Sequence, residues 1–275
     1  MPQPAKSAAA FDDVMAEARK PDRTCKVVFH PYPGPVTVRK GLALVMAHNG
    51  SDKARVKAQR NALDLLMQSN PMPQRVIIVE AVDEGAEPLF AGVKGAEHIN
   101  LTIHANSRGM WFKEALWSLG GRMAFTDPSI THVVWQDMDC SYVEADWAAT
   151  TMRDWGDAEF GQPARAFYFA DQPDALQFYR AELIEGCAST AIRGAIGGFP
   201  GLCWISTRKF FMERLGGAFA NLASGSGDTW LWTMLRGEKE MSGERFYEVT
   251  KPVRQGMRPR PKFYCGGLLA VHHFH

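Results

Sequence analysis

Residues 41–80 constrain the fold most, because two apolar runs in this segment flank one amphipathic helix. Residues 41–46 and 75–80 are short apolar runs, which is typical of buried strands. Residues 53–68 between them place apolar side chains on one face and Lys and Arg on the other, as an amphipathic helix does. A strand, a helix and a second strand in this order predict the opening of a parallel sheet with right-handed crossovers.

The rest of the chain continues to alternate strands and helices. We expect further strands at residues 97–104, 132–135, 164–170 and 268–271, and helices at residues 110–123, 144–155, 208–215 and 229–235. The predicted fold class is therefore α/β, a single Rossmann-like domain with a mostly parallel central sheet flanked by helices. We expect residues 1–40, which include a proline-rich run, to form an N-terminal extension, and residues 41–275 to form the domain.

Composition excludes several classes of protein. The chain has 31 Lys+Arg and 30 Asp+Glu, so it lacks the overall basic charge on which non-specific nucleic-acid binding relies, although a local basic patch stays open. Its five cysteines are scattered and form no C-x-x-C pair, which argues against a zinc site or a disulfide framework. The sequence shows no membrane span and no secretory signal, so we expect a cytoplasmic protein.

A pair of aspartates follows the strand predicted at residues 132–135. Asp137 and Asp139 are separated by one residue, and ligands of open α/β sheets bind outside the carboxyl ends of the strands. Two carboxylates there can approach a divalent cation such as Mg²⁺ or Mn²⁺, which in turn can hold a diphosphate. The alternative is a strand end whose aspartates cap a turn, since about one such pair is expected by chance in a chain of this length.

Four segments occur in the order found in family 2-like glycosyltransferases with the GT-A fold, and the chain resembles that family from about residue 41 onwards. Residues 42–49 resemble the first strand and donor loop, residues 106–113 the segment before the metal strand, residues 136–139 the metal-binding D-x-D, and residues 201–219 the acceptor-side segment. The resemblance implies a GT-A domain with a donor half at about 41–140 and an acceptor half at about 141–275.

The resemblance also implies an activity, namely a hexosyltransferase that uses a nucleotide sugar, by analogy a UDP-sugar, together with Mn²⁺ or Mg²⁺. An acidic motif, usually Glu-Asp, follows the acceptor segment in the family, and its Asp is the base of an inverting transfer. Here Gly227 stands where the Glu is usual, so only Asp228 is carried over. The alternative for Asp228 is a plain helix N-cap.

The resemblance and the chemistry of the side chains together suggest three further groups of residues. The metal ligands are Asp137, Asp139, His272 and His275, the last two because His272-x-x-His275 resembles the terminal ligands of galactosyltransferase-like members. The donor-binding residues are Ala47, Asn49, Glu80, Asn106, Lys113, Asp137 and Arg254, and the acceptor-binding residues are Trp204 and Trp230. Several of them have a plainer alternative: a solvated terminus for the histidines, a surface acid for Glu80, a solvated loop for Arg254 and core packing for the tryptophans.

Two other functions stay open. A nucleotidyltransferase shares a similar sheet and metal–diphosphate site, but it would need a Gly-rich basic loop after the first strand, and residues 47–51 contain one Gly and no Lys or Arg. A non-catalytic protein that binds a nucleotide or a sugar would bind without turnover. The acceptor is open among a saccharide, a small molecule, a protein and modified nucleic acid, and no obligate protein partner is evident.

Overall fold

The structure of the chain is a computed structural model, which describes residues 27–28, 37–50, 52–103, 112–170, 177–178, 181–185, 201–219 and 261–273. Its helices are α2 (Lys53–Leu66), α3 (Lys113–Ala124), α4 (Trp147–Asp154) and the π-helix η2 (Lys209–Arg214). Its strands are β1 (Val27–Val28), β2 (Val38–Asn49), β3 (Met72–Asp83), β4 (Glu97–Ile103), β5 (His132–Asp137), β6 (Cys140–Tyr142), β7 (Phe160–Ala170), β8 (Gln177–Phe178), β9 (Ala181–Glu185), β10 (Cys203–Thr207) and β11 (Phe263–His272).

One nine-stranded sheet organises the described residues, in the order β4-β3-β2-β5-β10-β7-β11-β6, with β9 paired to β7. The first four strands in this order are mutually parallel. Strand β10 is antiparallel to both neighbours, while β7 and β11 are parallel to each other. Strands β6 and β9 pair antiparallel with β11 and β7. Most strands therefore run in one direction, which confirms the predicted fold class.

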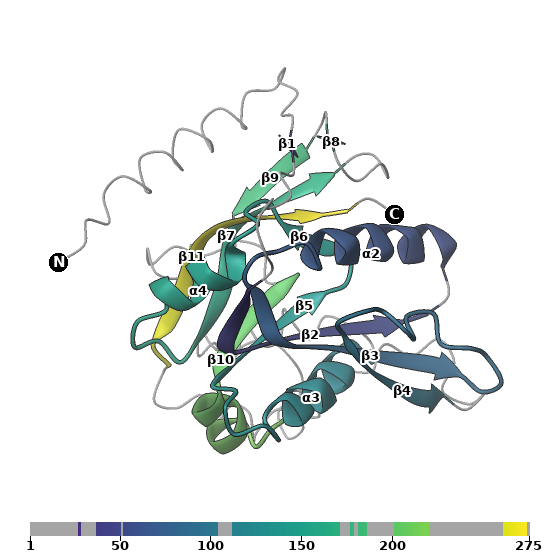
Figure 1. Cartoon of the computed structure of the whole chain (residues 1–275), viewed down its shortest axis with the longest axis horizontal. Coiled ribbons are helices and arrows are strands. Elements are labelled where there is room, and N and C mark those ends of the chain that lie inside the picture. The colour runs from purple at the N-terminus through teal and green to yellow at the C-terminus, as the bar shows by residue number, and fades with distance from the viewer. Residues whose placement is uncertain are drawn as a thin grey trace, which may run out of the picture.

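Helices cover both faces of the sheet (Figure 1). Helix α3 and η2 lie on one face, where a core cluster includes Trp117, Trp135 and Phe211. Helices α2 and α4 lie on the other face, where a second cluster includes Leu63 and Trp147. The two clusters divide β2 between them, because its successive side chains point to opposite faces. The molecule is thus a three-layer α/β/α structure built around buried strands.

Helix α3 packs closely on the sheet because it carries glycine at the contact. A Cβ atom on Gly120 would lie 2.3 Å from Val45 Cγ1 and 3.0 Å from Val79 Cγ2, and one on Gly121 would lie 2.8 Å from the Trp135 ring. The pair Gly120-Gly121 weakens helix propensity. The absence of side chains at these two positions lets the helix backbone approach β2 closely. This close approach fixes where the N-terminus of α3 meets the strand ends.

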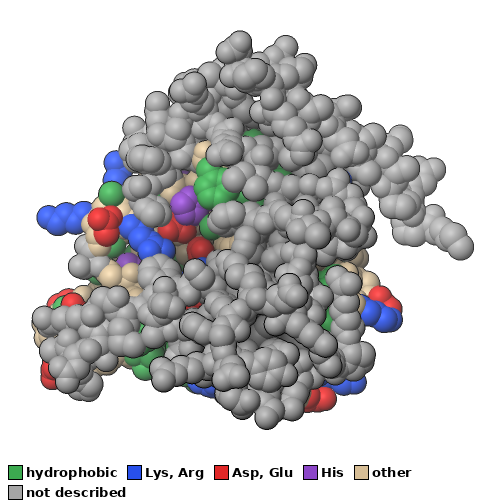
Figure 2. All heavy atoms as spheres, turned by 180° about the vertical axis from the view of Figure 1, so that it is seen from behind, with side chains coloured by type: hydrophobic (Ala, Val, Ile, Leu, Met, Phe, Trp, Pro, Cys, Tyr) green, Lys and Arg blue, Asp and Glu red, His purple; other side chains and the backbone are tan. Residues whose placement is uncertain are grey.

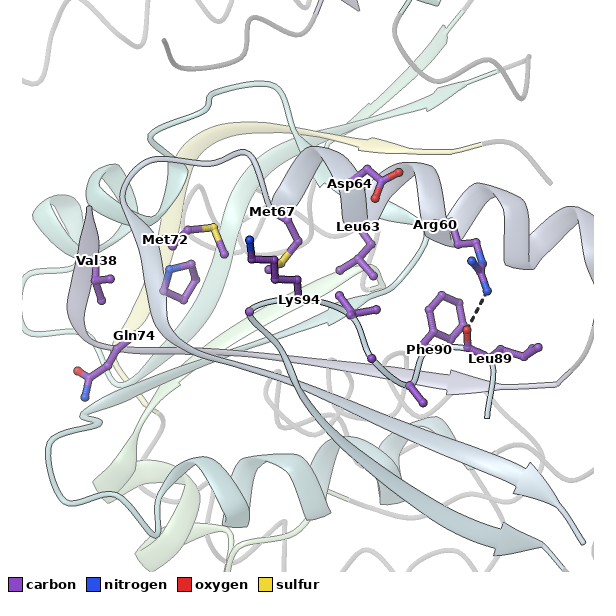
Figure 3. Close-up of a pocket in the computed structure, with 15 residues that line it drawn as sticks. Val38, Arg60, Leu63, Asp64, Met67, Met72, Gln74, Leu89, Phe90 and Lys94 are labelled. Carbon is purple, nitrogen blue, oxygen red and sulfur yellow. Dashed lines mark hydrogen bonds between the residues drawn. The ribbon is translucent and has the colours of Figure 1, made fainter. Parts of the chain in front are cut away.

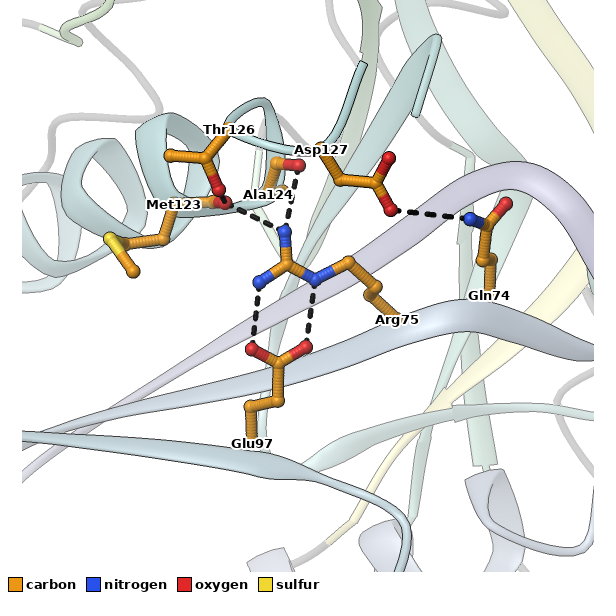
Figure 4. A network of polar contacts seen from close by, with 7 residues as sticks. All are labelled: Gln74, Arg75, Glu97, Met123, Ala124, Thr126 and Asp127. Carbon is orange, nitrogen blue, oxygen red and sulfur yellow. Dashed lines mark hydrogen bonds and ion pairs between the residues drawn. The ribbon is translucent and has the colours of Figure 1, made fainter. Parts of the chain in front are cut away.

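The C-terminal end of α3 is held by an arginine from β3 (Figure 4). Arg75 donates hydrogen bonds to the carbonyls of Met123 (2.8 Å) and Ala124 (3.0 Å), which are among the last acceptors of the helix. The same guanidinium donates two 2.7 Å hydrogen bonds to Glu97 of β4. This fork lowers the pKa of the Glu97 carboxyl below its usual value, mainly through the hydrogen bonds from Arg75. One side chain therefore joins β3, β4 and α3.

Most observed strands are longer than the predicted ones, whereas the observed helices are shorter. Strand β2 begins at Val38, inside the segment expected to be an extension, and β11 begins at Phe263 rather than at residue 268. The short helix expected at residues 208–215 is a π-helix at Lys209–Arg214. The helix expected at residues 229–235 lies outside the described residues. Among the described helices, none is both long enough and apolar enough to cross a membrane.

Candidate functional site

The candidate site lies where β2 and β5 end side by side. Ala47 of β2 is in register with Asp137, the last residue of β5. The chain then turns through Met138 and Asp139 into β6, and the side-chain amide of Gln136 closes this turn by donating a 2.6 Å hydrogen bond to the carbonyl of Cys140. The two aspartates therefore occupy the carboxyl edge of a parallel sheet, where the sequence placed them and where ligands of such sheets bind.

Asp137 lies on the face of the sheet that α3 covers. Lys113, the first residue of α3, places its Nζ 3.2 Å from Oδ1 and 3.3 Å from Oδ2 of Asp137. Its ammonium also lies 4.8 Å from the centre of the Trp117 ring. The backbone of Asp137 is fixed as well, because its N–H donates a 2.8 Å hydrogen bond to the carbonyl of Leu202. Two residues named as donor-binding, Lys113 and Asp137, are thus in contact.

Asp139 has a different set of neighbours. Its side chain is 1% exposed, and Arg55 Nε of α2 lies 3.3 Å from its Oδ2. His272 Nε2, at the end of β11, lies 3.6 Å from its Oδ1. The structure thereby brings together Asp139 and His272, which the sequence named as metal ligands from opposite ends of the domain. Arg55 was not among the site residues predicted from the sequence. Its position in the first turn of α2, the helix that follows β2, could have indicated that it lies near the carboxyl edge of the sheet.

His273 holds the turn that carries Asp139. Its backbone N–H donates a 2.7 Å hydrogen bond to the carbonyl of Asp139, and its Nε2 lies 2.8 Å from Ser141 Oγ. Burial of the ring lowers the pKa of His273 to about 4, so this side chain is neutral near pH 7. His273 was not among the predicted site residues, because nothing local in the sequence indicates that it faces inward.

Asp139 and His272 are two side chains of the kinds that can bind a divalent cation. Asp139 supplies buried carboxylate oxygens and His272 an imidazole nitrogen, a combination that suits Mn²⁺ or Zn²⁺. Within the described residues no group of three His, Cys, Asp or Glu side chains is close enough to hold a metal ion. His275, the remaining ligand named from the sequence, lies outside the described residues.

The carboxylate of Glu80 is bound by other groups of the protein. Its carboxylate accepts hydrogen bonds from the backbone N–H groups of Leu89 (2.7 Å) and Phe90 (3.1 Å), and His98 Nε2 lies 2.9 Å from Oε2. The Phe90 ring in turn meets the buried ring of His48 edge to face, with centroids 4.9 Å apart. The carboxylate thus fixes the loop between β3 and β4 against the end of β2. That is a structural role, which the strand-end position alone did not indicate.

Trp204 requires a correction. It was named as an acceptor-binding residue with core packing as the alternative, and the structure places it in the core. Its side chain is fully buried, and its ring stacks on Phe160 with centroids 4.8 Å apart. The reason is its position in β10, a central strand between β5 and β7. A ring packed in this way has no face left for a sugar.

For the other predicted site residues the structure gives only a position in the fold, or they lie outside the described residues. Ala47 and Asn49 lie at the end of β2, beside the turn that carries the aspartates. Five residues lie outside the described part of the chain, and their roles stay predictions: Asn106, Asp228, Trp230, Arg254 and His275. The segment at residues 254–262, which contains Arg254 and three further Lys or Arg residues, is described only at residues 261 and 262.

A separate cavity of about 910 Å³ lies between α2, the start of β3 and the loop at residues 89–95 (Figure 3). Its lining is largely apolar, with Leu63, Met67 and Met72 facing inward and Lys94 lying across it. Arg60 joins two of its walls by donating a 2.9 Å hydrogen bond to the carbonyl of Leu89. The aspartate pair and His272 are not among the residues that line it, so this cavity is distinct from the candidate site.

The surface of the molecule shows charges of both signs meeting on one side. Figure 2 shows acidic, basic and histidine side chains close together on this face.

Comparisons with known proteins add a likeness of fold. No family model matches the sequence, and no curated protein matches it. The structure is similar to Rv0371c from Mycobacterium tuberculosis H37Rv, with a TM-score of 0.41 at 13% identity over 75% of this chain and 86% of that chain. The complex of Rv0371c with manganese gives a TM-score of 0.38 at 13% identity over 74% and 84%. S. aureus TarS 1–349 gives 0.46 at 13% identity over 80% and 66%. These likenesses assign no residue and no role in this chain.

Proposed function

We propose that this chain is a metal-dependent glycosyltransferase, which moves a sugar from a nucleotide sugar to an acceptor hydroxyl. The observation that carries the proposal is the meeting of Asp139 and His272 at the carboxyl edge of the sheet, with Oδ1 and Nε2 3.6 Å apart. One residue comes from the turn after β5 and the other from the end of β11. Local turn capping by aspartates explains neither the buried Asp139 nor its histidine neighbour.

The residues present suggest a division of tasks. Asp139 and His272 would hold Mn²⁺ or Mg²⁺, with Asp137 close by and His275 as a further candidate. When bound, the cation neutralises the charge on the diphosphate leaving group. Lys113 offers a second positive charge beside Asp137, which favours a phosphate at this edge. Ala47 and Asn49 at the end of β2 form one wall of the donor pocket in this proposal.

The transfer itself needs a base for the acceptor hydroxyl. We assign this role to Asp228, as the family resemblance implies, so the transfer is an inverting one. A UDP-sugar is the proposed donor on the same analogy. Arg254 is a proposed phosphate contact and Trp230 a proposed acceptor contact. The acceptor stays open among a saccharide, a small molecule, a protein and modified nucleic acid.

The test measures UDP binding and UDP-sugar turnover with and without Mn²⁺. Asp139→Asn should lose Mn²⁺-dependent UDP binding, because it removes the buried charge that faces His272. Asp228→Asn should keep that binding but lose turnover by about 100-fold or more, as expected for removal of a general base. Asp64→Asn, which changes an exposed carboxylate on α2, is the control and should behave as wild type.

Two results would contradict the proposal. If no nucleotide sugar binds with any divalent cation, the aspartate pair is a chance pair and the function is wrong. If UDP-sugars bind but neither wild type nor Asp228→Asn turns them over with any acceptor or water, the chain is a binding protein rather than a transferase.

A further inference from the structure

We propose that Arg55 is a phosphate-binding residue of this site, and that its ion pair with Asp139 makes the site favour a cation that arrives with a diphosphate over a cation alone. This inference rests on the proposed function and deepens it, because it names how the site would distinguish its ligands. It concerns a residue for which neither the family resemblance nor the sequence pattern gave a role.

The geometry gives the two oxygens of Asp139 different neighbours. Arg55 Nε lies 3.3 Å from Oδ2, and His272 Nε2 lies 3.6 Å from Oδ1. The Asp139 side chain is 1% exposed, whereas that of Arg55 is 24% exposed. Arg55 is therefore the more exposed member of the pair, although the Nε that faces Asp139 is itself buried. A ligand that approaches Asp139 meets Arg55 at the same time.

The position of Arg55 is fixed by helix α2. Asp52 caps this helix by accepting a 2.8 Å hydrogen bond from the backbone N–H of Arg55, and α2 packs over β6. The side chain therefore projects from an anchored first turn toward the turn between β5 and β6. The N-terminal end of a helix also favours negative charge, so the arginine and the helix act in the same direction.

The charges decide which ligand the site prefers. A bare divalent cation beside Asp139 is repelled by the guanidinium that already neutralises part of the carboxylate charge. A diphosphate brings its own negative charges, to which an arginine can donate paired hydrogen bonds. Arg55 therefore weakens binding of the cation alone and strengthens binding of the nucleotide with its cation. A residue that only supported the fold would weaken both when removed.

The first measurement is Mn²⁺ binding without nucleotide, followed by the electron paramagnetic resonance signal of free Mn²⁺. Arg55→Gln should bind Mn²⁺ roughly fivefold more tightly than wild type, as loss of one nearby positive charge in a partly solvated site predicts. Arg55→Lys keeps the charge and should stay near wild type. Lys53→Gln is the matched control, because it removes one positive charge from the same helix turn at an exposed position.

The second measurement is UDP binding at saturating Mn²⁺, by calorimetry. Here Arg55→Gln should bind about tenfold more weakly, since a charge-assisted contact to phosphate is lost. Arg55→Lys should recover part of this loss, because an ammonium binds phosphate without the paired geometry. Lys53→Gln should again resemble wild type. The expected result is therefore that Arg55→Gln strengthens binding of Mn²⁺ alone and weakens binding of UDP with Mn²⁺.

The outcomes separate this inference from the function on which it rests. If Asp139→Asn loses Mn²⁺ binding but Arg55→Gln weakens Mn²⁺ binding or leaves UDP binding unchanged, the role of Arg55 is wrong and the metal site stands. If Asp139→Asn binds Mn²⁺ as wild type does, the metal site itself is wrong, and the role of Arg55 is overturned with it.

Discussion

At the scale of single residues, each carboxylate at the end of β5 has a basic neighbour from a different helix. Lys113 of α3 contacts Asp137 on one face of the sheet, and Arg55 of α2 contacts Asp139 on the other. The central residue Met138 lies in the core cluster on the side of α2 and α4. The chain leaves the strand after Asp137 and turns, and this turn places the two charges where two separate helices can reach them.

Glu80 gives a prediction at this scale. Glu80→Gln should lower the free energy of unfolding by about 1–3 kcal/mol, because an amide nitrogen would face backbone N–H groups that now donate to the carboxylate. Urea unfolding measures this change. Glu87→Gln, in the exposed part of the same loop, should have little effect.

Unchanged stability of Glu80→Gln would instead favour the donor-binding role that was predicted for Glu80 from the sequence. If Glu80→Gln leaves stability unchanged but weakens UDP binding, the carboxylate contacts the nucleotide rather than holding the loop at Leu89 and Phe90.

At the scale of elements, the contact between α3 and the sheet depends on glycine. Gly120→Ala improves helix propensity by about 1 kcal/mol, yet the added methyl group would meet Val45 Cγ1 at 2.3 Å. Overpacking of this kind costs about 1–3 kcal/mol, so we expect net destabilisation of up to about 2 kcal/mol. Thermal unfolding of the variant measures it.

A double variant tests the cause. Val45→Ala removes the methyl groups that the new Cβ would meet, so it should cost less in the Gly120→Ala background than alone. Additive effects would mean that the two side chains do not interfere and that the glycine has another role.

Much of this level could be predicted from the sequence, because apolar runs and amphipathic faces determine where buried strands and packed helices form. The aspartate turn, the parallel opening unit and the approach of His272 were all expected. The partners of those residues were not: Arg55, His273 and Ser141 contact the site through tertiary packing. Burial of Trp204 was expected only as the alternative to acceptor binding, and no local pattern indicates that Glu80 binds a loop, since both depend on which strand becomes the neighbour.

At the scale of the whole molecule, burial of histidine predicts that stability falls in acid. His132, at the start of β5, has its pKa lowered from 6.5 to about 4 by burial. The unfolded chain therefore takes up a proton below pH 6.5 that the folded chain takes up only near pH 4. Stability falls across this window, by about 1.4 kcal/mol per pH unit and about 3 kcal/mol in all.

The measurement is the free energy of unfolding in urea between pH 7 and pH 4. His132→Phe cannot take up a proton, so its stability should fall less steeply than that of wild type over this window. His273, also neutral through burial, should give both proteins the same residual slope. Equal pH dependence of wild type and His132→Phe would show that the ring is solvated.

The contact between His273 and Ser141 also bears on the order in which the molecule folds. Ser141 and His273 are 132 positions apart in the sequence, so their contact closes a long loop and carries the entropic cost of doing so. Contacts of such separation form after local ones. A folding intermediate in which β11 is not yet docked would have Asp139 without His272. We therefore expect a cation bound here to slow unfolding rather than to speed folding, since it stabilises a feature that only the finished fold possesses.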